Sequence, residues 1–377
     1  MNTDKITSYL DSLLDRDIPS VDCVIYENHE IIYRHMNGFV DAEKKKAING
    51  NEMYLMFSMT KVQTMTAIMQ LIEKGLLSLE DDVAKYLPAY NNLTYKDTND
   101  KDTIKKLAAP LKIKHLVSMS SGLDYDLSRP GIVRVLNEQG NAATTLELVN
   151  SFAETPLDFI PGSHFAYSLS HDVAAAVVEV VSGRSFGQYL AENIWKPLHM
   201  DKTLFAKPMN DDLPNLAAVY INENDKISLT DTSCMYQLSE SYESGGAGLI
   251  SCLADYSVFA DTLACGGVSK YDTRILKAET IEIMKQNLLN DVARNDLVNT
   301  MGRKGYGYGC GVQVFLDPES VASPAPKGVF GWDGAAGSCI IMDTASHRSL
   351  VYIMHVRNCG WAYSEIHPTL RDLMYAP

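Results

Sequence analysis

A serine and a lysine three residues apart, Ser58 and Lys61, form the arrangement in this sequence with the clearest potential for catalysis. They belong to Ser58-Met59-Thr60-Lys61, the one Ser-x-x-Lys of the chain, and they open a stretch (58–74) whose apolar residues recur at helical spacing. Residues i and i+3 share one face of a helix, so the lysine amine is expected beside the serine hydroxyl. The first turn of a helix also supplies free N–H groups and the positive end of the helix dipole. A neutral lysine there can deprotonate the serine, whereas the alternative interpretation is an N-capping serine followed by a surface lysine.

The segments around this pair resemble the serine β-lactamase and penicillin-binding-protein-like hydrolases, above all their class C and esterase-like branch. The similar segments extend over roughly residues 15 to 357 and follow the order of the family: 56–61, 71–83, 86–88, 115–123, 161–168, 245–251 and 255–256. A collinear series of motifs is far more specific than a single Ser-x-x-Lys. The resemblance implies a serine hydrolase that acts through an acyl-enzyme.

The same resemblance implies a role for each residue of the site. Ser58 is the nucleophile, Lys61 the general base, and Tyr167 the residue that passes a proton to the leaving group. Because the lysine and the tyrosine are coupled, either one can be the first to accept the serine proton. The backbone N–H groups of Ser58 and Ala335 form the oxyanion hole, a role that needs no particular side chain.

Two positions depart from the pattern of the β-lactamases and peptidases, and both concern the substrate. Leu169 stands where those enzymes carry an asparagine that binds the substrate amide. Trp332-Asp333-Gly334 replaces their Lys-Thr-Gly and resembles the Trp-x-Gly of esterase-like members. The cation that would bind a β-lactam or peptide carboxylate is therefore missing. We expect Leu169, Trp332, Asp333 and Gly334 to contribute to substrate binding and to favour small esters.

Three functions are compatible with these residues. The first is a carboxylesterase-type hydrolase, able also to transfer acyl groups. The second is an amide hydrolase, either a β-lactamase or a D-amino-acid-specific peptidase, and Leu169 and Trp332 count against it. The third is a catalytically inactive binding protein of the same fold, and the intact Ser58, Lys61 and Tyr167 count against that. No oligomeric state is predicted.

A second serine motif points to a different hydrolase class. Residues 183–187 match the Gly-x-Ser-x-Gly nucleophile elbow of the α/β-hydrolases, which requires a strand before it and a helix after it. Residues 173–181 are instead predicted to be helical. We therefore interpret Gly183 as a helix stop and Ser185 as the N-cap of the next helix.

Composition and charge exclude several classes of protein and partner. The 377 residues are 46% hydrophobic and 21% charged, as in ordinary globular proteins. The net charge of −14 argues against nucleic acid or an anionic membrane as a partner. The resemblance implies a small ester or amide substrate as the partner instead. No apolar stretch approaches the ~20 residues of a membrane span, and no signal peptide is apparent.

Cysteine and histidine usage predicts neither a metal nor a cofactor. The seven cysteines are dispersed without metal-ligand spacing, which indicates reduced thiols and a cytoplasmic protein. The nine histidines include no His-Glu-x-x-His and no clustered ligands, and the alternating glycines at 305–311 fail the dinucleotide fingerprint.

The order of predicted elements indicates an α+β fold with an antiparallel sheet built from both chain termini and flanked by helices. Strands are expected in the first sixty residues, at 21–26 and 31–34, and again at 308–315, 329–332, 338–343 and 350–356. Helices are expected near 58–74, 112–119, 144–153, 170–182, 186–194, 253–264 and 278–287. We expect residues 1–55 and 240–377 to form a sheet lobe and residues 56–239 a mostly helical lobe, with the site between them.

Overall fold

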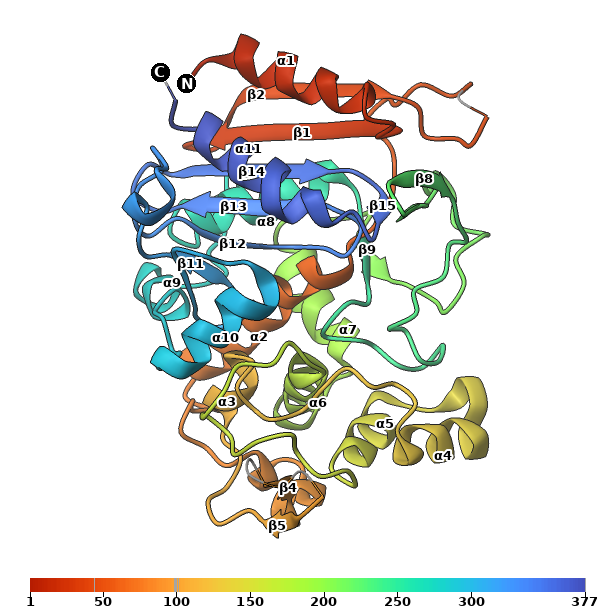
Figure 1. Ribbon diagram of the computed structural model, residues 1–377, viewed down its shortest axis with the longest axis vertical. Helices are drawn as coiled ribbons and strands as arrows, with labels where there is room; N and C mark the ends of the chain where they lie inside the picture. The colour runs from red at the N-terminus through yellow and green to blue at the C-terminus, as the bar shows by residue number, and fades with distance from the viewer. Residues whose placement is uncertain (44, 98–99, 101, 377) are drawn as a thin grey trace.

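A seven-stranded antiparallel sheet joins the two ends of the chain in the computed structural model, which describes residues 1–43, 45–97, 100 and 102–376 (Figure 1). Its strands, in spatial order, are β10 (Tyr306–Tyr308), β11 (Gln313–Phe315), β12 (Phe330–Asp333), β13 (Cys339–Asp343), β14 (Arg348–Ile353), β1 (Ser20–Glu27) and β2 (Glu30–Gly38). The N-terminal strand β1 pairs with the C-terminal strand β14, with Asp22 opposite Ile353 and Glu27 opposite Arg348. The expected sheet from both termini is therefore confirmed.

Helices cover both faces of this sheet, so the inner strands β1, β13 and β14 are buried on both sides. The covering helices are α1 (Thr3–Leu14) and α11 (His367–Leu373) on one face, and α2 (Thr60–Glu73) and α8 (Leu253–Ala264) on the other. Because successive side chains of a strand point to opposite faces, Val21, Cys23 and Ile25 pack toward the first pair, while Val24 and Tyr26 belong to the core on the second side. Such two-sided burial explains the nearly unbroken apolar runs of the sequence.

The helical part of the molecule packs against the far side of α2 (Figure 1). Its elements are α3 (Ile113–Val117), α4 (Pro130–Gln139), α5 (Thr145–Phe152), α6 (Ser170–Ser182) and α7 (Phe186–Leu190), which runs into a π-helical turn at Ala191–Trp195. A short 3-10 turn, Phe57–Met59, leads directly into α2, whose residues from Thr60 to Leu71 are all buried. A helix buried on every side is held firmly in place, and this one positions the serine and the lysine.

Smaller elements complete the fold around these two parts. The small sheets contain β3 (Tyr54–Leu55), β9 (Leu249–Ser251) and β6 (Leu204–Phe205); β15 (Val356–Arg357), β7 (Tyr220–Glu223) and β8 (Lys226–Leu229); and β4 (Thr94–Lys96) with β5 (Ile104–Lys106). Helices α9 (Ala278–Met284) and α10 (Asp291–Met301) precede the C-terminal strands. The α+β class is confirmed, whereas the lobe boundaries at 55/56 and 239/240 stay a prediction.

Three features of the fold differ from the sequence expectation. Residues 3–14, for which no element was predicted, form helix α1, because Asn2 caps the helix and Ile6, Leu10 and Leu13 are spaced to bury one face. The single strand expected at 308–315 is two strands, β10 and β11, joined by a turn in which Gly309 N–H donates to Val312 O. Helices α4, α10 and α11 were not anticipated. Among the described residues, no helix is long and apolar enough to cross a membrane.

Candidate active site

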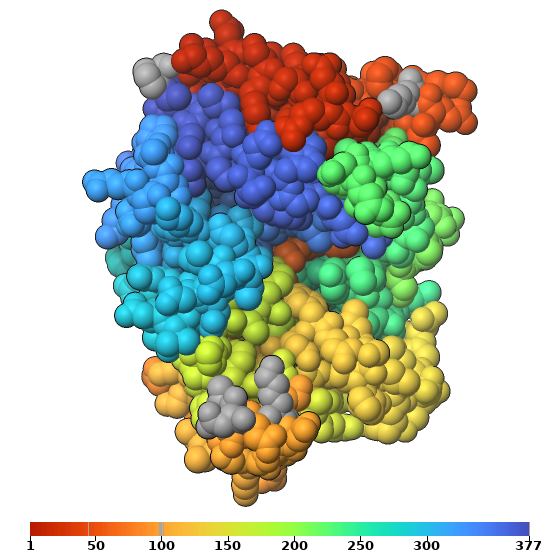
Figure 2. All heavy atoms as spheres, viewed as in Figure 1, coloured from red at the N-terminus to blue at the C-terminus, as the bar shows by residue number. Residues whose placement is uncertain are grey.

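A cavity of about 450 Å³ opens where the C-terminal segments meet the helical part of the chain. In Figure 2 the surface is hollowed near the centre of the view, where blue and cyan segments meet yellow ones. The cavity is lined by Ser58, Tyr125, Tyr167, Tyr236, Thr300, Met301, Gly302, Arg303, Asp333, Ala335, Gly360, Tyr363 and Ser364. Four of the predicted site residues, Ser58, Tyr167, Asp333 and Ala335, therefore share one cavity.

The backbone before Ser58 is held in an unusual conformation. Phe57 has a φ of 46°, in the left-handed region that a bulky residue rarely adopts. Such a conformation costs about 1–3 kcal/mol and persists only where the surroundings impose it. Here the buried Phe57 ring packs edge-on against Tyr236, with the ring centroids 6.4 Å apart. The strained turn presents Ser58 to the cavity at the start of α2.

Lys61 lies beneath the serine and is completely buried. Its Nζ atom is 3.1 Å from Ser58 Oγ, 2.9 Å from Tyr125 Oη and 2.7 Å from the carbonyl oxygen of Gly246. A neutral amine has two N–H donors and one lone pair. Donation to Tyr125 and Gly246 leaves the lone pair for the Ser58 hydroxyl proton, so the partners suit a general base.

The surroundings of Lys61 favour its neutral form at physiological pH. Burial lowers the pKa of Lys61 from its usual 10.5 to about 7, because desolvation disfavours the charged amine. The negative charges of Asp172 and Asp333 act in the opposite direction and limit the fall. A general base works best when its pKa is close to the working pH, because much of it is then unprotonated and it still binds a proton strongly.

The 245–248 segment explains why that part of the sequence is rich in glycine. A Cβ on Gly246 would lie 2.5 Å from Asp172 Oδ2 and 3.0 Å from Tyr125 Oη, so only glycine allows its carbonyl to reach Lys61. Asp172 fixes the segment by accepting hydrogen bonds from Ser244 Oγ (2.6 Å), Tyr242 Oη (2.8 Å) and the N–H of Gly246 (3.3 Å). The glycine-rich segment 245–248 thus helps to hold the Lys61 amine in place, through the carbonyl oxygen of Gly246.

Tyr167 lies next to both Lys61 and the nucleophile. The Lys61 amine is 4.5 Å from the centre of its ring, and the Trp332 indole N–H donates to Tyr167 Oη over 2.9 Å. Burial raises the pKa of Tyr167 well above its usual 10, although hydrogen bonds with Ser58 and Trp332 oppose that rise. The residue is therefore a phenol at neutral pH, a group suited to giving a proton to a departing alkoxide.

The loop between β12 and β13 brings Ala335 to the nucleophile. Within the described chain, the Ala335 N–H has no hydrogen-bond partner, which leaves it free for a substrate oxygen. A Cβ on Gly334 would lie 2.4 Å from the carbonyl oxygen of Met56, so this glycine permits the close approach of the loop to the turn that carries Ser58. The Tyr363 hydroxyl holds the loop by donating to Gly334 O over 3.0 Å. These positions are compatible with the predicted oxyanion hole.

The remaining predicted substrate-binding residues lie behind the cavity wall or form part of it. Leu169 precedes α6, is buried in the main core and is absent from the cavity lining. Trp332 is also buried and reaches the site through Tyr167, with ring centroids 5.6 Å apart. Asp333 lines the cavity, but its carboxylate accepts a hydrogen bond from Arg303, which also lines it. A cation is therefore present after all, in a different place from the Lys-Thr-Gly lysine.

Sequence reasoning missed three residues of this site. Tyr125 follows the recognised segment 115–123 by two positions, and a tyrosine so close to a family motif was a usable signal. Asp172 and Arg303 carried no such signal, because their partners Gly246 and Asp333 are 74 and 30 positions away.

Ser185 has the structural role that we expected. Helix α6 precedes it and ends at Gly183 in the left-handed conformation, so the strand of a nucleophile elbow is replaced by a helix. The exposed Ser185 side chain caps α7 by accepting from the N–H of Gln188 over 3.2 Å.

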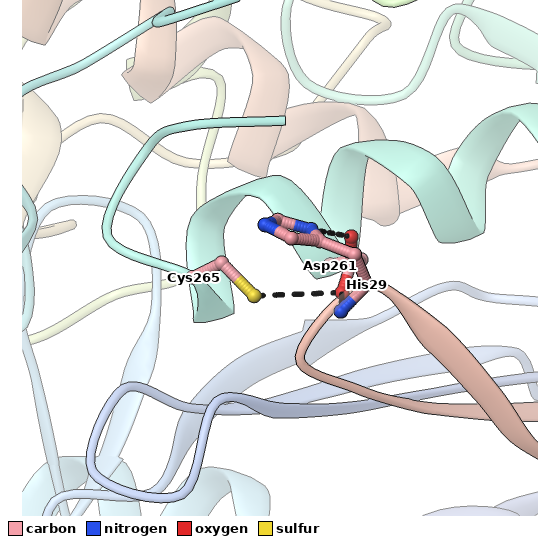
Figure 3. Close-up of side chains that lie close together, drawn as sticks. All are labelled: His29, Asp261 and Cys265. Carbon is pink, nitrogen blue, oxygen red and sulfur yellow. Dashed lines mark hydrogen bonds and ion pairs between the residues drawn. The ribbon is translucent and has the colours of Figure 1, made fainter. Parts of the chain in front are cut away.

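His29, Asp261 and Cys265 come together far from Ser58 in the sequence, although no spacing indicated clustered ligands (Figure 3). Asp261 accepts hydrogen bonds from the backbone N–H (3.2 Å) and Nδ1 (2.7 Å) of His29, while Cys265 Sγ lies 3.6 Å from its carboxylate. Burial raises the pKa of the Cys265 thiol to about 12. Through these contacts Asp261 ties the β1–β2 turn to α8.

Comparison with known proteins identifies the family to which the fold belongs. The Beta-lactamase family model matches residues 4–359. A "Putative D-alanyl-D-alanine carboxypeptidase" of Escherichia coli K12 is 26% identical over 374 residues, which cover 92% of this chain and 80% of that protein. "Esterase EstB" of Burkholderia gladioli is 25% identical over 390 residues, covering 97% and 93%.

The fold is also similar to that of solved hydrolase structures. "EstCE1, a hydrolase with promiscuous acyltransferase activity" superposes with a TM-score of 0.80 at 25% identity, covering 99% of this chain and 98% of that one. The relatives thus carry the names of an esterase and of a putative carboxypeptidase, so the choice between ester and amide depends on the residues of this chain's own cavity.

Proposed function

The chain belongs to the beta-lactamase family of serine hydrolases, and from this premise we propose that it is a carboxylesterase-type enzyme that cleaves small esters through an acyl-enzyme on Ser58. The observation that carries the proposal is the contact of 3.1 Å between Ser58 Oγ and the Nζ atom of a fully buried Lys61, whose other partners are uncharged. A buried lysine without a contacting carboxylate is a base, and the serine is the proton donor next to it.

The residues act in a simple order. Neutral Lys61 accepts the Ser58 proton as Oγ attacks the ester carbonyl, and the N–H groups of Ser58 and Ala335 stabilise the oxyanion. The proton then passes through Tyr167 to the leaving alkoxide as the C–O bond breaks, leaving an ester on Ser58. Water deacylates the serine by the same steps in reverse. An alcohol in place of water would give acyl transfer, and EstCE1 is a hydrolase with promiscuous activity of that kind.

The cavity favours esters over amides for two reasons. Four tyrosines, Tyr125, Tyr167, Tyr236 and Tyr363, contribute to its walls and offer apolar area and hydroxyl groups to an uncharged substrate. In addition, Leu169 supplies no amide-binding side chain. Because esters need less leaving-group assistance than amides, a site with few amide contacts should lose amide turnover first.

The test compares substrates from the two classes on the same enzyme. We expect kcat/KM for p-nitrophenyl acetate and butyrate to exceed the values for nitrocefin and for a D-alanyl-D-alanine peptide. Intact mass after fluorophosphonate treatment should show one adduct, located on Ser58 by peptide mapping. More efficient turnover of nitrocefin or the peptide than of both esters would replace the esterase proposal with the amide hydrolase, and the absence of both labelling and turnover would favour an inactive binding protein.

A further inference from the structure

The cavity contains two formal charges, and they neutralise each other. Among the residues that line it, Arg303 is the one cation and Asp333 the one anion. Arg303 Nη2 donates to Asp333 Oδ2, and the two side chains are only 6% and 7% exposed. A pair so strongly desolvated is screened little by solvent, so the partners remain coupled.

Neighbouring groups keep this pair charged and in place. His367 Nδ1 lies 3.7 Å from the same Asp333 oxygen. Burial alone would raise the pKa of Asp333, but Arg303 and His367 outweigh it and hold that pKa below its usual value. The guanidinium also lies over Trp332 and Tyr363, 5.5 and 5.8 Å from the ring centres. The pair of Arg303 and Asp333 is therefore a fixed part of the cavity wall.

Arg303 nevertheless keeps unused binding capacity. Its Nε atom is buried and has no hydrogen-bond partner in the described structure. A guanidinium binds a carboxylate best through two parallel hydrogen bonds, whereas here Asp333 accepts a single one, from Nη2. A substrate carboxylate would have to displace Asp333 or enter beside its negative charge.

We infer that Asp333 determines the charge selectivity of the site: by holding Arg303, it excludes substrates that carry a carboxylate near the scissile bond and selects uncharged esters. This inference rests on the proposed esterase function of Ser58. It makes Asp333 a specificity-determining residue rather than a group that takes part in bond cleavage. Replacing its negative charge while keeping its shape should release Arg303 for an anionic substrate.

The experiment uses p-nitrophenyl hexanoate and p-nitrophenyl hydrogen adipate, which have acyl chains of the same length and differ in the terminal carboxylate. The wild-type protein should prefer hexanoate by at least about tenfold in kcat/KM. In Asp333→Asn the adipate-to-hexanoate ratio should rise at least about tenfold, the order expected for one charge-assisted hydrogen bond. Nitrocefin, whose carboxylate lies on the other side of the scissile bond, should gain relative to hexanoate as well.

Two variants control the result. Adding Arg303→Gln to Asp333→Asn should remove the gain, because the released cation is then gone. Asp22→Asn breaks a buried pair with Arg34 between β1 and β2, away from the cavity, and should leave the ratio unchanged. Circular dichroism and the fluorophosphonate labelling yield confirm that each variant is folded.

Two outcomes would overturn the inference. One is a wild-type enzyme that cleaves the adipate as efficiently as hexanoate, a measurement that stands even if Asp333→Asn does not fold. The other is a folded Asp333→Asn variant that keeps the wild-type ratios for adipate and nitrocefin. Failure of the proposed function looks different, because wild-type protein would then cleave neither ester and Ser58 would not be labelled.

Discussion

Two cations are buried beside the same cavity, and their partners are opposite in kind. Lys61 contacts a hydroxyl, a phenol and a carbonyl oxygen, all uncharged, and burial lowers its pKa to about 7. Burial also acts against the charge of Arg303, but its contact with Asp333 outweighs that effect and raises the pKa of Arg303 above its usual value. Desolvation therefore creates a base only where no carboxylate is in contact with the cation. The first cation can move a proton, whereas the second serves binding and structure.

The largest loss of activity should follow removal of the atom on which Lys61 acts. Ser58→Ala should lower kcat/KM for p-nitrophenyl butyrate by on the order of 10⁴-fold or more, as nucleophile removal does in other serine hydrolases. Fluorophosphonate labelling should disappear with it. Ser185→Ala is the control and should retain nearly full activity, since that serine caps α7. Labelling that persists in Ser58→Ala and is lost in Ser185→Ala would contradict the mechanism.

The next largest effect should come from the proton-transfer groups themselves. Lys61→Ala and Tyr167→Phe should each cost about 10²–10⁴-fold in kcat/KM, the usual contribution of a general acid or base. Because the two residues act as one unit, the double variant should be only slightly less active than the less active of the two single variants. Losses that simply multiply would assign them to independent steps.

A smaller effect is expected from Tyr125, which completes the uncharged surroundings of Lys61. Tyr125→Phe removes the hydroxyl 2.9 Å from Nζ but keeps the ring that packs against Tyr167. We expect a loss of about tenfold in kcat, the order of one hydrogen bond at about 1.4 kcal/mol, with little change in KM. An increase in KM with kcat unchanged would make Tyr125 a substrate contact instead.

The smallest change should be a shift in pH dependence. Since the base must be neutral, kcat/KM should rise with pH through an apparent pKa of about 7. Asp172→Asn removes a negative charge that raises the pKa of Lys61, so the acid limb should move to lower pH while the plateau changes little. Assays of kcat/KM against pH in buffers of constant ionic strength measure the position of the acid limb and the height of the plateau. A limb that moves to higher pH would mean that Asp172 does not act on Lys61 through its charge.

Local geometry decided what the sequence could predict in this site. Ser58 and Lys61 are three positions apart on one helix, so their contact follows from helical geometry alone. Tyr167 and Trp332 are 165 positions apart, yet the order of the family motifs predicted both, and the structure joins them by a hydrogen bond. In contrast, the pair of Arg303 and Asp333 depends on how the turn after α10 reaches the end of β12, which no pattern along the chain encodes.

In the fold, too, elements with a clear pattern in their own sequence were predicted, and elements that depend on distant contacts were not. Helix α6 was predicted at its observed bounds because Gly183 ends a clear apolar pattern. Helix α10 was missed because its eleven residues bury little beyond Ala293 and Leu297, so the packing that stabilises it is weakly recorded in its own sequence. Leu169 was assigned to the pocket from its place in a motif, and its buried side chain shows that a motif position does not fix the direction of a side chain.

The pairing of β1 with β14 has a consequence for the synthesis of this protein. Glu27 and Arg348, which face each other across the sheet and form an ion pair, are 321 positions apart in the chain. On the ribosome β1 emerges long before β14, so one of its edges has no partner until the 321 positions from Glu27 to Arg348 have been made. Contacts of such sequence separation form slowly, and an unpaired apolar strand invites association with other chains. The nucleophile helix, which packs beneath this sheet, should therefore reach its working position only after translation has passed β14, so the enzyme becomes active late and all at once.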